Sequence, residues 1–415
     1  MQFYEFKETQ ERVILIGVQT EVGDDVEASL DELEELAETA GAETVAKVIQ
    51  NREAVHPGTY IGKGKIEEVA SLLRALDANG VICDDELSPA QLNNLERELD
   101  CKVMDRTLLI LDIFAGRAIS SEGKIQVELA QLRYRAARLV GLRESLSRLG
   151  GGIGTRGPGE KKLETDRRLI RTRISALKAE LAQVEKHREL IRGKRSRGNL
   201  KTAAIVGYTN AGKSTLLNTL TGAGILAEDK LFATLDPTTR VLELKDGQQI
   251  LLTDTVGFIR KLPHHLVEAF KSTLEEAKYA DYIIHVVDAS NPQAELQMFT
   301  VYETLRELGA TGKKIVTLLN KQDQVTGSDI RDLKADYTVK CSARTGEGLE
   351  EFKEVLAKLL AEDQIYLEEL YPYSEAGKIQ KIREFGSLLS EEYREDGIFV
   401  KARVPAEIFV SVMPK

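Results

Sequence analysis

Along the first 115 residues, short apolar runs alternate with stretches whose apolar residues recur at helical spacing. Short apolar runs bounded by polar turns are typical of buried strands, and repeats of three and four residues are typical of helices. Ser88 followed by Pro89 adds a helix start, since serine caps a helix and proline suits its first position. The alternation predicts an α/β domain with a mostly parallel sheet over residues 1–115. Its strands are expected at 13–18, 44–50, 81–85 and 102–105, and its helices at 26–39, 65–76, from Pro89 and from Thr107.

Residues 116–198 carry two long helical patterns joined by a glycine-rich connection. The patterns run from Ile125 to Leu146 and from Ile170 to Ile191, with an apolar residue at most of the steps of three or four. Residues 149–159 between them contain six glycines, a composition that hydrophobic packing does not hold in place. The segment therefore predicts an antiparallel helical hairpin with a glycine-rich tip loop.

The remaining chain divides into two patterns. Residues 199–362 contain apolar runs at 202–206, 250–252 and 314–319, typical of buried parallel strands, and end in a helical stretch at 348–360. Residues 363–415 alternate strand-like and helix-like stretches on a smaller scale. We expect a mostly parallel α/β domain at 199–362 and a small C-terminal α+β domain at 363–415, which makes the whole chain an α/β multidomain protein.

The sequence G-x-x-x-x-G-K-S directly follows the first of these strands, from Gly207 to Ser214, and precedes a helical pattern. Glycines in such a loop let backbone N–H groups curl round a phosphate at a helix N-terminus. Lys213 would reach the β and γ phosphates, and the Ser214 hydroxyl would bind Mg²⁺. The alternative interpretation of the bare motif is an ordinary tight turn. Three further motifs disfavour it.

Asp254-Thr255-Val256-Gly257 ends the run at 250–252, where a carboxylate supports the Mg²⁺ shell and a glycine N–H meets the γ-phosphate. Asn320-Lys321-Gln322-Asp323 ends the run at 314–319. The two oxygens of Asp323 match the N1–H and N2–H₂ donors of guanine, a pair that adenine lacks. Ser342-Ala343-Arg344 follows a further strand-like stretch at 337–340. In this order, the four motifs predict a P-loop GTPase domain of the kind found in translation factors.

The net charge of −10 conceals a basic segment. Residues 131–201 contain 20 Lys and Arg against 7 Asp and Glu, which leaves a strongly acidic remainder. Arg148, Arg156, Lys161, Lys162, Arg167 and Arg168 gather round the tip loop with Gly150, Gly151 and Gly152. A basic, glycine-rich tip on a stiff hairpin indicates binding to the phosphates and shape of folded RNA. A solvated helix face with a plain linker is the alternative interpretation of the charge.

Other features narrow the class of protein. The three scattered cysteines predict no disulfide framework, and no Cys/His cluster has metal-ligand spacing. No apolar run approaches the length of a membrane span, and the N-terminus does not have a signal-peptide pattern, so we expect a cytoplasmic protein. Before one helix of the first domain stands a segment with Tyr60, Gly62, Lys63 and Gly64, which allows either a phosphate site or a structural turn.

The chain resembles the HflX family of ribosome-associated GTPases. The resemblance rests on His56-Pro-Gly-Thr-Tyr-Ile-Gly-Lys-Gly, the tip sequence Gly-Gly-Gly-Ile-Gly-Thr-Arg-Gly-Pro-Gly-Glu, Phe-Ala-Thr-Leu-Asp-Pro-Thr-Thr, and Asp-Thr-Val-Gly-Phe. It implies a GTPase that binds the large ribosomal subunit near its peptidyl-transferase region and splits stalled or idle ribosomes, notably under stress. Some members of the family also show ATP hydrolysis and RNA unwinding linked to the front domain. We further expect a monomer when free and no membrane partner.

Site residues follow from the motifs together with the resemblance. Mg²⁺ is expected on Ser214 and on a threonine of the first switch, with Asp254 behind them. The family pattern favours Thr234 for that threonine, and Thr238 and Thr239 stay open. Phe258 stands where many GTPases have a glutamine that orients water, so the catalytic group is unassigned apart from the Gly257 backbone. The expected GTP-binding residues are Gly207, Tyr208, Thr209, Asn210, Ala211, Gly212, Lys213, Ser214, Thr215, Phe232, Ala233, Thr234, Leu235, Asp236, Asp254, Thr255, Val256, Gly257, Asn320, Lys321, Gln322, Asp323, Ser342, Ala343 and Arg344.

Two other functions remain open at this point. One is a GTP-gated factor for assembly of the large subunit, which would bind the same RNA without splitting ribosomes. The other is an ATP-driven RNA helicase run from the front domain, for which Tyr60 to Gly64 is the only sequence support. Intact ribosomes after incubation with GTP would favour the first. ATPase activity that survives Lys213→Ala would favour the second.

Overall fold

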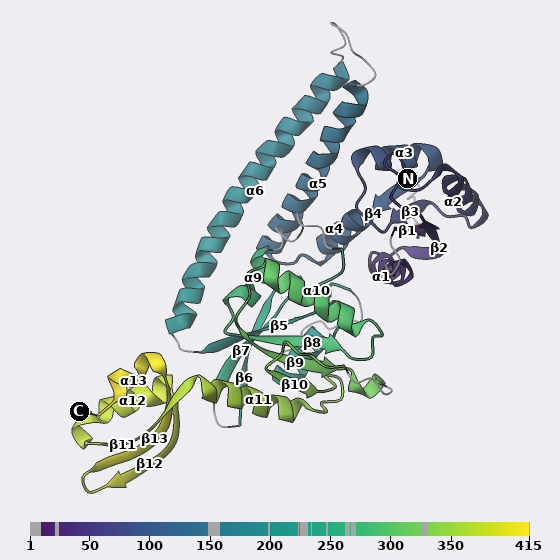
Figure 1. Ribbon diagram of the computed structural model, residues 1–415. Helices are drawn as coiled ribbons and strands as arrows, with labels where there is room; N and C mark the ends of the chain where they lie inside the picture. Colours follow the sequence, from purple (N-terminus) through teal and green to yellow (C-terminus); the bar gives the residue numbers. More distant parts are fainter. Residues whose placement is uncertain are drawn as a thin grey trace, which may run out of the picture. The chain divides into compact units, whose positions relative to one another are not determined.

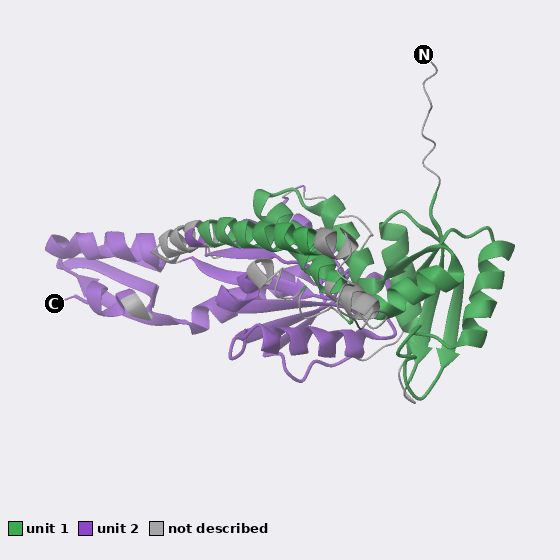
Figure 2. Ribbon diagram, turned by 90° about the horizontal axis from the view of Figure 1, so that it is seen from above, with its two compact units in different colours: residues 1–185, 228–236, 260–272 green, residues 186–227, 237–259, 273–415 purple. Residues whose placement is uncertain are grey.

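The computed structural model describes residues 10–414 apart from 21–24, 148–157, 198–199, 223, 225–230, 234, 246–247, 262–265, 267–270 and 326–329. It separates into two compact units, coloured differently in Figure 2. Unit 1 contains residues 1–185, 228–236 and 260–272, and unit 2 contains residues 186–227, 237–259 and 273–415. The chain therefore crosses from one unit to the other several times.

Unit 1 begins with a four-stranded, fully parallel sheet in the order β2-β1-β3-β4. The strand β1 is buried along most of its length because helices cover the sheet, so its sequence is a continuous apolar run (Figure 1). The predicted α/β architecture of this segment is confirmed. The strands are β1 (Arg12–Gln19), β2 (Glu43–Asn51), β3 (Gly80–Cys83) and β4 (Lys102–Asp105), and the helices are α1 (Val26–Thr39), α2 (Lys63–Ala75), α3 (Pro89–Leu99) and α4 (Arg106–Arg117).

The carboxyl ends of β3 and β4 hold buried charges. Arg106, 2% exposed, is paired with Asp84 at 2.7 Å and with Glu32. Asp84 also accepts a hydrogen bond from Ser29 and is paired with Lys261 from the segment 260–272. Burial raises the pKa of Asp84, whereas the ammonium of Lys261 opposes that rise. The cluster thus has a partner for each of these buried charges, as burial of ions requires.

The predicted helical hairpin is confirmed. Helices α5 (Ser121–Ser147) and α6 (Pro158–Arg197) run side by side in opposite directions (Figure 1). Arg173 forms a two-pronged ion pair with Glu128, and Arg167 donates to the carbonyl of Leu139. Leu177 is fully buried. The tip residues 148–157 lie outside the described residues.

Unit 2 carries a six-stranded sheet in the order β10-β9-β8-β5-β7-β6, parallel except for the antiparallel edge pair β6 and β7. The predicted α/β class and mostly parallel sheet are confirmed. The apolar runs that predicted them form the buried central strands of this sheet. Its strands are β5 (Lys201–Gly207), β6 (Thr238–Glu243), β7 (Gln249–Asp254), β8 (Tyr282–Asp288), β9 (Lys314–Asn320) and β10 (Tyr337–Lys340); its helices include α7 (Lys213–Thr221), α9 (Lys271–Tyr279), which begins at the end of unit 1, α10 (Ala294–Glu307), η1 (Gln322–Gln324) and α11 (Leu349–Glu362).

The C-terminal segment forms a three-stranded antiparallel sheet in the order β11-β13-β12 with helices packed on it. Its core comes from apolar residues at alternate positions of β13, such as Val400 and Val404. The predicted α+β pattern is confirmed, although β12 and α13 were not predicted. The elements are β11 (Gln364–Tyr371), η2 (Tyr373–Glu375), α12 (Ala376–Phe385), β12 (Ser387–Arg394), β13 (Gly397–Pro405) and α13 (Ala406–Val412).

Asp84→Ala should destabilise unit 1 by about 3–5 kcal/mol, because it leaves the buried guanidinium of Arg106 without its full set of counter-charges. Native-state hydrogen exchange of the amides in β1 and β3 measures this locally. The matched control is Glu43→Ala, which removes an ion pair with Arg12 whose side chains are 37% and 48% exposed. That change should cost less than about 1 kcal/mol. Equal losses in the two variants would show that the buried cluster contributes nothing special.

Candidate nucleotide-binding site

The phosphate loop joins the carboxyl end of β5 to the start of α7, where ligands bind in open α/β sheets. Two of its glycines are required by close contacts. A Cβ on Gly207 would lie 2.2 Å from the carbonyl oxygen of Val286, and one on Gly212 would lie 2.3 Å from the Asn320 side-chain nitrogen. Gly212 also has a φ of +94°, which favours glycine. The motif therefore folds as the phosphate-binding turn that the sequence predicts.

Lys213 is only 6% exposed, and its ammonium donates to the carbonyl of Tyr208 at 2.7 Å within the same loop. Burial lowers the pKa of Lys213 to about 8, while the carboxylate of Asp254 acts in the opposite direction. A buried cation next to a turn of backbone N–H groups attracts phosphate strongly. Ser214, the next residue, donates from its hydroxyl to Asp254 at 2.7 Å. Asp254 is fully buried at the end of β7.

The segment from Asp254 to Phe258 is joined to the phosphate loop by backbone hydrogen bonds. Phe258 N–H donates to the Gly207 carbonyl at 3.1 Å, and Thr209 N–H donates to the Phe258 carbonyl at 2.8 Å. A Cβ on Gly257 would lie 2.7 Å from the Cα of Thr209. The phenyl ring of Phe258 is 1% exposed, so this side chain packs in the core and has no group that orients water.

The residues expected to recognise the base come together at the ends of β9 and β10. Asn320, 2% exposed, donates to the Ala211 carbonyl and accepts from Ala343 N–H, both at 2.8 Å. It therefore holds the phosphate loop against the 342–344 loop. Ser342 donates to the Asp323 carboxylate at 2.6 Å. That bond orients Asp323, and both carboxylate oxygens keep acceptor capacity for the two donors of a guanine base.

One supporting residue was missed by the sequence analysis. Asp288, at the end of β8, pairs with the ammonium of Lys321 at 2.8 Å. Lys321 has a φ of +61°, a left-handed conformation that costs free energy for a residue with a side chain. The ion pair helps to hold it. The signal available in the sequence was the place of Asp288 at the carboxyl end of a buried strand.

The expected first-switch residues divide between the two units. Thr234 lies outside the described residues. Phe232 and Leu235 are buried in unit 1, as part of the segment 228–236. Thr238 and Thr239 open β6 in unit 2, where Thr238 lies opposite Asp254 in the strand register. The hydroxyl of Thr239 is 3.0 Å from that of Thr253, so it is engaged within the sheet.

The expected RNA-binding residues are only partly described. Arg148, Gly150, Gly151, Gly152 and Arg156 lie outside the described residues. Lys161, Lys162, Arg167 and Arg168 lie in the first turns of α6. Arg167 is half-buried and bonds the Leu139 carbonyl, whereas Arg168 is exposed. The structure thus gives Arg167 a packing role and leaves Arg168 accessible.

The segment from Tyr60 to Gly64 has structural reasons for its composition. Tyr60 is 1% exposed, has a φ of +64° and donates from its hydroxyl to Asp85 at 2.7 Å. A Cβ on Gly62 would lie 2.5 Å from the guanidinium of Arg52, and Gly62 N–H donates to Gln50. These contacts favour the turn over the phosphate site at this position.

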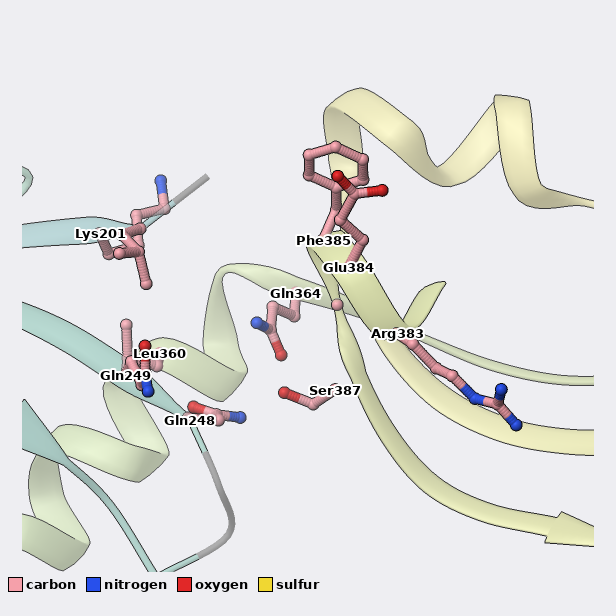
Figure 3. A pocket seen from close by; sticks show the side chains of 11 residues that line it. Lys201, Gln248, Gln249, Leu360, Gln364, Arg383, Glu384, Phe385 and Ser387 are labelled. Carbon is pink, nitrogen blue, oxygen red and sulfur yellow. The ribbon is translucent and has the colours of Figure 1, made fainter. Parts of the chain in front are cut away.

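A cavity of about 280 Å³ lies elsewhere in unit 2, between the six-stranded and the three-stranded sheets (Figure 3). On one side it reaches the amino ends of β5 and β7, which begin at Lys201 and Gln249. The phosphate loop lies at the opposite, carboxyl end of β5. Figure 3 shows Lys201 and Arg383 on opposite sides of the cavity, with the side chain of Arg383 directed away. The cavity therefore does not gather charged groups round one ligand.

Within the ranges given above, no group of three His, Cys, Asp or Glu side chains is placed to hold a metal ion. No helix among these residues is long and apolar enough to span a membrane.

The phosphate loop, the Asp254–Gly257 segment and the Asn320–Asp323 site define the class of protein, which is a P-loop GTPase that binds GTP and GDP and hydrolyses GTP. Models of known families match three successive stretches: "GTP-binding GTPase N-terminal" at 27–115, "GTP-binding GTPase Middle Region" at 117–195 and "50S ribosome-binding GTPase" at 202–321. The chain belongs to the HflX family of GTPases, as full-length relatives show.

Among these relatives, the GTPase HflX of Lacrimispora saccharolytica is 68% identical over 98% of this chain and 97% of its own length. The GTPase HflX of Escherichia coli is 42% identical over 95% of this chain and 94% of its own. A GTP-binding protein from Sulfolobus solfataricus, solved in complex with GDP, is 26% identical, covers 84% of this chain and 98% of its own, and has a TM-score of 0.45. The family expected from the motifs is confirmed.

We expect the contribution of Lys213 to the affinity for GTP to be nearly constant below about pH 7 and to fall as the pH rises through 8. Burial sets the pKa of Lys213 at about 8 in the ligand-free loop, and the negative charge of a bound triphosphate would raise that pKa. Binding therefore takes up a proton above pH 8, and the affinity should fall about tenfold between pH 7 and pH 9. Titration calorimetry in buffers of different ionisation enthalpy measures both quantities.

The control for this prediction is Lys213→Gln, which has no ammonium to titrate. It should bind GTP more weakly at every pH and lack the proton uptake. A wild-type affinity that does not change across this range would contradict the assignment.

Proposed function

We propose that this GTPase acts in the cytoplasm, binds the large ribosomal subunit through its helical hairpin, and uses GTP to split stalled or idle ribosomes, particularly under stress. The observation that carries the proposal is the concentration of positive charge on the hairpin of an otherwise acidic chain. The match of residues 202–321 to a family described as 50S ribosome-binding GTPases supports the partner. Membership of the HflX family supports the ribosome as the partner and the proposed activity.

The proposed chemistry includes Mg²⁺, which GTPases of this fold generally use. The hydroxyl of Ser214 and the carboxylate of Asp254, 2.7 Å apart, are oxygen donors of the kind that Mg²⁺ prefers. We infer that the Ser214 hydroxyl binds the ion directly. The Asp254 carboxylate would hold the Ser214 hydroxyl and act on the ion without binding it directly. When bound, the ion would neutralise the charge that develops on the phosphates.

Thr238 is the first-switch threonine that we propose as the second protein ligand, because its backbone lies opposite Asp254 whereas the Thr239 hydroxyl is taken by Thr253. Thr238→Ala should then lower Mg²⁺-dependent GTP hydrolysis about tenfold to a hundredfold. Thr239→Ala should cost about 1 kcal/mol of stability and little activity. Single-turnover hydrolysis separates these effects. A larger loss of GTP hydrolysis in Thr234→Ala than in Thr238→Ala would identify Thr234, which the family pattern favours, as the Mg²⁺ ligand.

Hydrolysis in the free protein should be slow, since the buried ring of Phe258 replaces the glutamine that orients water in many GTPases. We propose that the ribosome completes the arrangement of water and backbone. The same surface would then stimulate hydrolysis and receive the hairpin, which couples the two events.

Replacing Arg168 and Arg171 by alanine should weaken ribosome binding, because both are exposed on α6 and carry no packing role in the described structure. The salt dependence of binding should become shallower by up to about two phosphate contacts. Splitting of intact ribosomes, followed by light scattering with GTP, should slow in parallel. The matched control replaces Lys358 and Lys381, two exposed lysines of unit 2, and should leave both unchanged.

Two outcomes would contradict the proposal. A wild-type protein that binds ribosomes with GTP but leaves them intact would instead be a factor for assembly of the large subunit. Equal effects of the hairpin and control variants would show that the charge of the hairpin is a solvated surface only.

A further inference from the structure

A buried carboxylate, Asp332, joins three parts of unit 2. It lies in the connection between η1 and β10, and its side chain is 2% exposed. One carboxylate oxygen accepts hydrogen bonds from the hydroxyls of Tyr302 in α10 and Thr317 in β9, both at 2.6 Å. The other oxygen accepts from Lys334 N–H at 2.9 Å. Asp332 therefore holds its own loop against a helix and a central strand.

The surroundings keep this carboxylate ionised. Burial raises the pKa of Asp332, but the neighbouring His285, Thr317 and Tyr302 outweigh that rise and hold the pKa below its ordinary value. His285, in β8, is 1% exposed, and its ring Nδ1 lies 3.7 Å from the carboxylate. Burial lowers the pKa of His285, although Asp332 acts in the opposite direction. The carboxylate thus offers the same two acceptor oxygens throughout the neutral pH range.

The connection from Val325 to Asp336 depends on such point contacts. Its described residues, 325 and 330–336, contain no helix or strand. Val325 and Ile330 pack against a small apolar core of α10, β8 and β9. Asp336 accepts a hydrogen bond from the backbone of β9 at 2.7 Å. Asp332, with three donors, is the polar contact that fixes the middle of this stretch.

The residues expected to recognise the base stand at the two ends of this connection. Asp323 lies in η1 at its start, and Ser342 follows β10 at its end and donates to Asp323 at 2.6 Å. Thr317 precedes Asn320 by three positions in β9, which is the neighbour of β10 in the sheet (Figure 1). The Asp332 carboxylate therefore ties together the segments that present Asp323 and Ser342.

We propose that Asp332 is a positioning residue for guanine recognition: its hydrogen bonds fix the place of Asp323 and so set the preference for a base with a 2-amino group. The inference lies outside the proposed ribosomal function and rests on the assignment of Asp323 to the base. Hydrogen bonds weaken steeply when distance and direction change. A small displacement of Asp323 therefore costs base selectivity, while the phosphate contacts of Lys213 are unaffected.

The ratio of the dissociation constants for IDP and GDP tests this role. IDP carries hypoxanthine, which keeps N1–H but lacks the 2-amino group of guanine. In the wild type, GDP should bind about tenfold or more tightly than IDP. Asp332→Asn should lower this ratio about fivefold or more, because an amide has one acceptor oxygen where the carboxylate uses two. Titration calorimetry measures both constants, and partial unfolding would change them equally without changing the ratio.

Two tyrosines supply a matched pair of variants. Tyr302→Phe removes a hydroxyl that donates to Asp332, and Tyr282→Phe removes one that donates to Asp363 from the amino end of β8. Tyr302→Phe should lower the IDP-to-GDP ratio about threefold. Tyr282→Phe should leave the ratio unchanged, even where the two variants lose similar amounts of thermal stability.

Variants of Thr317 keep the Asp332 carboxylate and test the network should Asp332→Asn fold poorly. Thr317→Ser retains the hydroxyl and should retain the wild-type ratio, whereas Thr317→Val should lower it as Tyr302→Phe does. A wild-type ratio in both Tyr302→Phe and Thr317→Val, or an equal decrease in Tyr282→Phe, would overturn the inference. Equal affinity of the wild type for the two nucleotides would overturn it together with the assignment of Asp323. Failure of the wild type to split ribosomes would overturn the proposed function alone, since these measurements use no ribosomes.

Discussion

The close approach of three backbone segments at the phosphate loop is the constraint on which the nucleotide site depends. Gly207, Gly212 and Gly257 each face atoms that leave no room for a Cβ, in β8, in Asn320 and in Thr209 respectively. The hydrogen bonds between Gly207, Thr209 and Phe258 then close the loop onto the Asp254 segment. Because two of these contacts and all of these hydrogen bonds are made by backbone, the loop presents its N–H groups in a fixed arrangement before any nucleotide arrives. Lys213 is buried by the same arrangement, and its lowered pKa is a direct result.

Two described residues that lie near the motifs of the nucleotide site in the sequence, Asp236 and Lys261, have their partners in unit 1. Asp236 accepts hydrogen bonds from Ile119 N–H and Ser120 N–H just before α5, and the ammonium of Lys261 pairs with Asp84 and Asp85. Lys261 has a φ of +52°, so its backbone also adopts a conformation that only firm contacts maintain. Each residue follows or precedes, in the chain, a strand or loop of the nucleotide site. Unit 2 thus contains the candidate nucleotide site, and unit 1 contains the partners of Asp236 and Lys261.

Local patterns predicted most of the fold and most of the nucleotide site. The strands β1, β5 and β9 are buried on both faces, so their apolar runs were unambiguous, and the motifs from Gly207 and Asn320 lie at the strand ends where the chemistry requires them. The strand β12 was missed because its sequence, Ser387 to Arg394, is half-exposed and mostly polar. The pairs Asp236–Ser120 and Lys261–Asp84 join residues more than 110 positions apart. No spacing rule in one sequence relates such residues, since only the packed fold brings them together.

Burial of Phe258 has a consequence for how hydrolysis is controlled. A glutamine at this position would bring a hydrogen-bonding group into the site. The isolated protein would then contain its own group for orienting the attacking water. A ring that is 1% exposed contributes packing instead and fixes the Gly207–Phe258 contact. We therefore expect the rate of hydrolysis to depend on groups other than the Phe258 side chain that position the attacking water. Under the function proposed above, GTP would be held until the basic hairpin has bound the ribosome and would be hydrolysed only then.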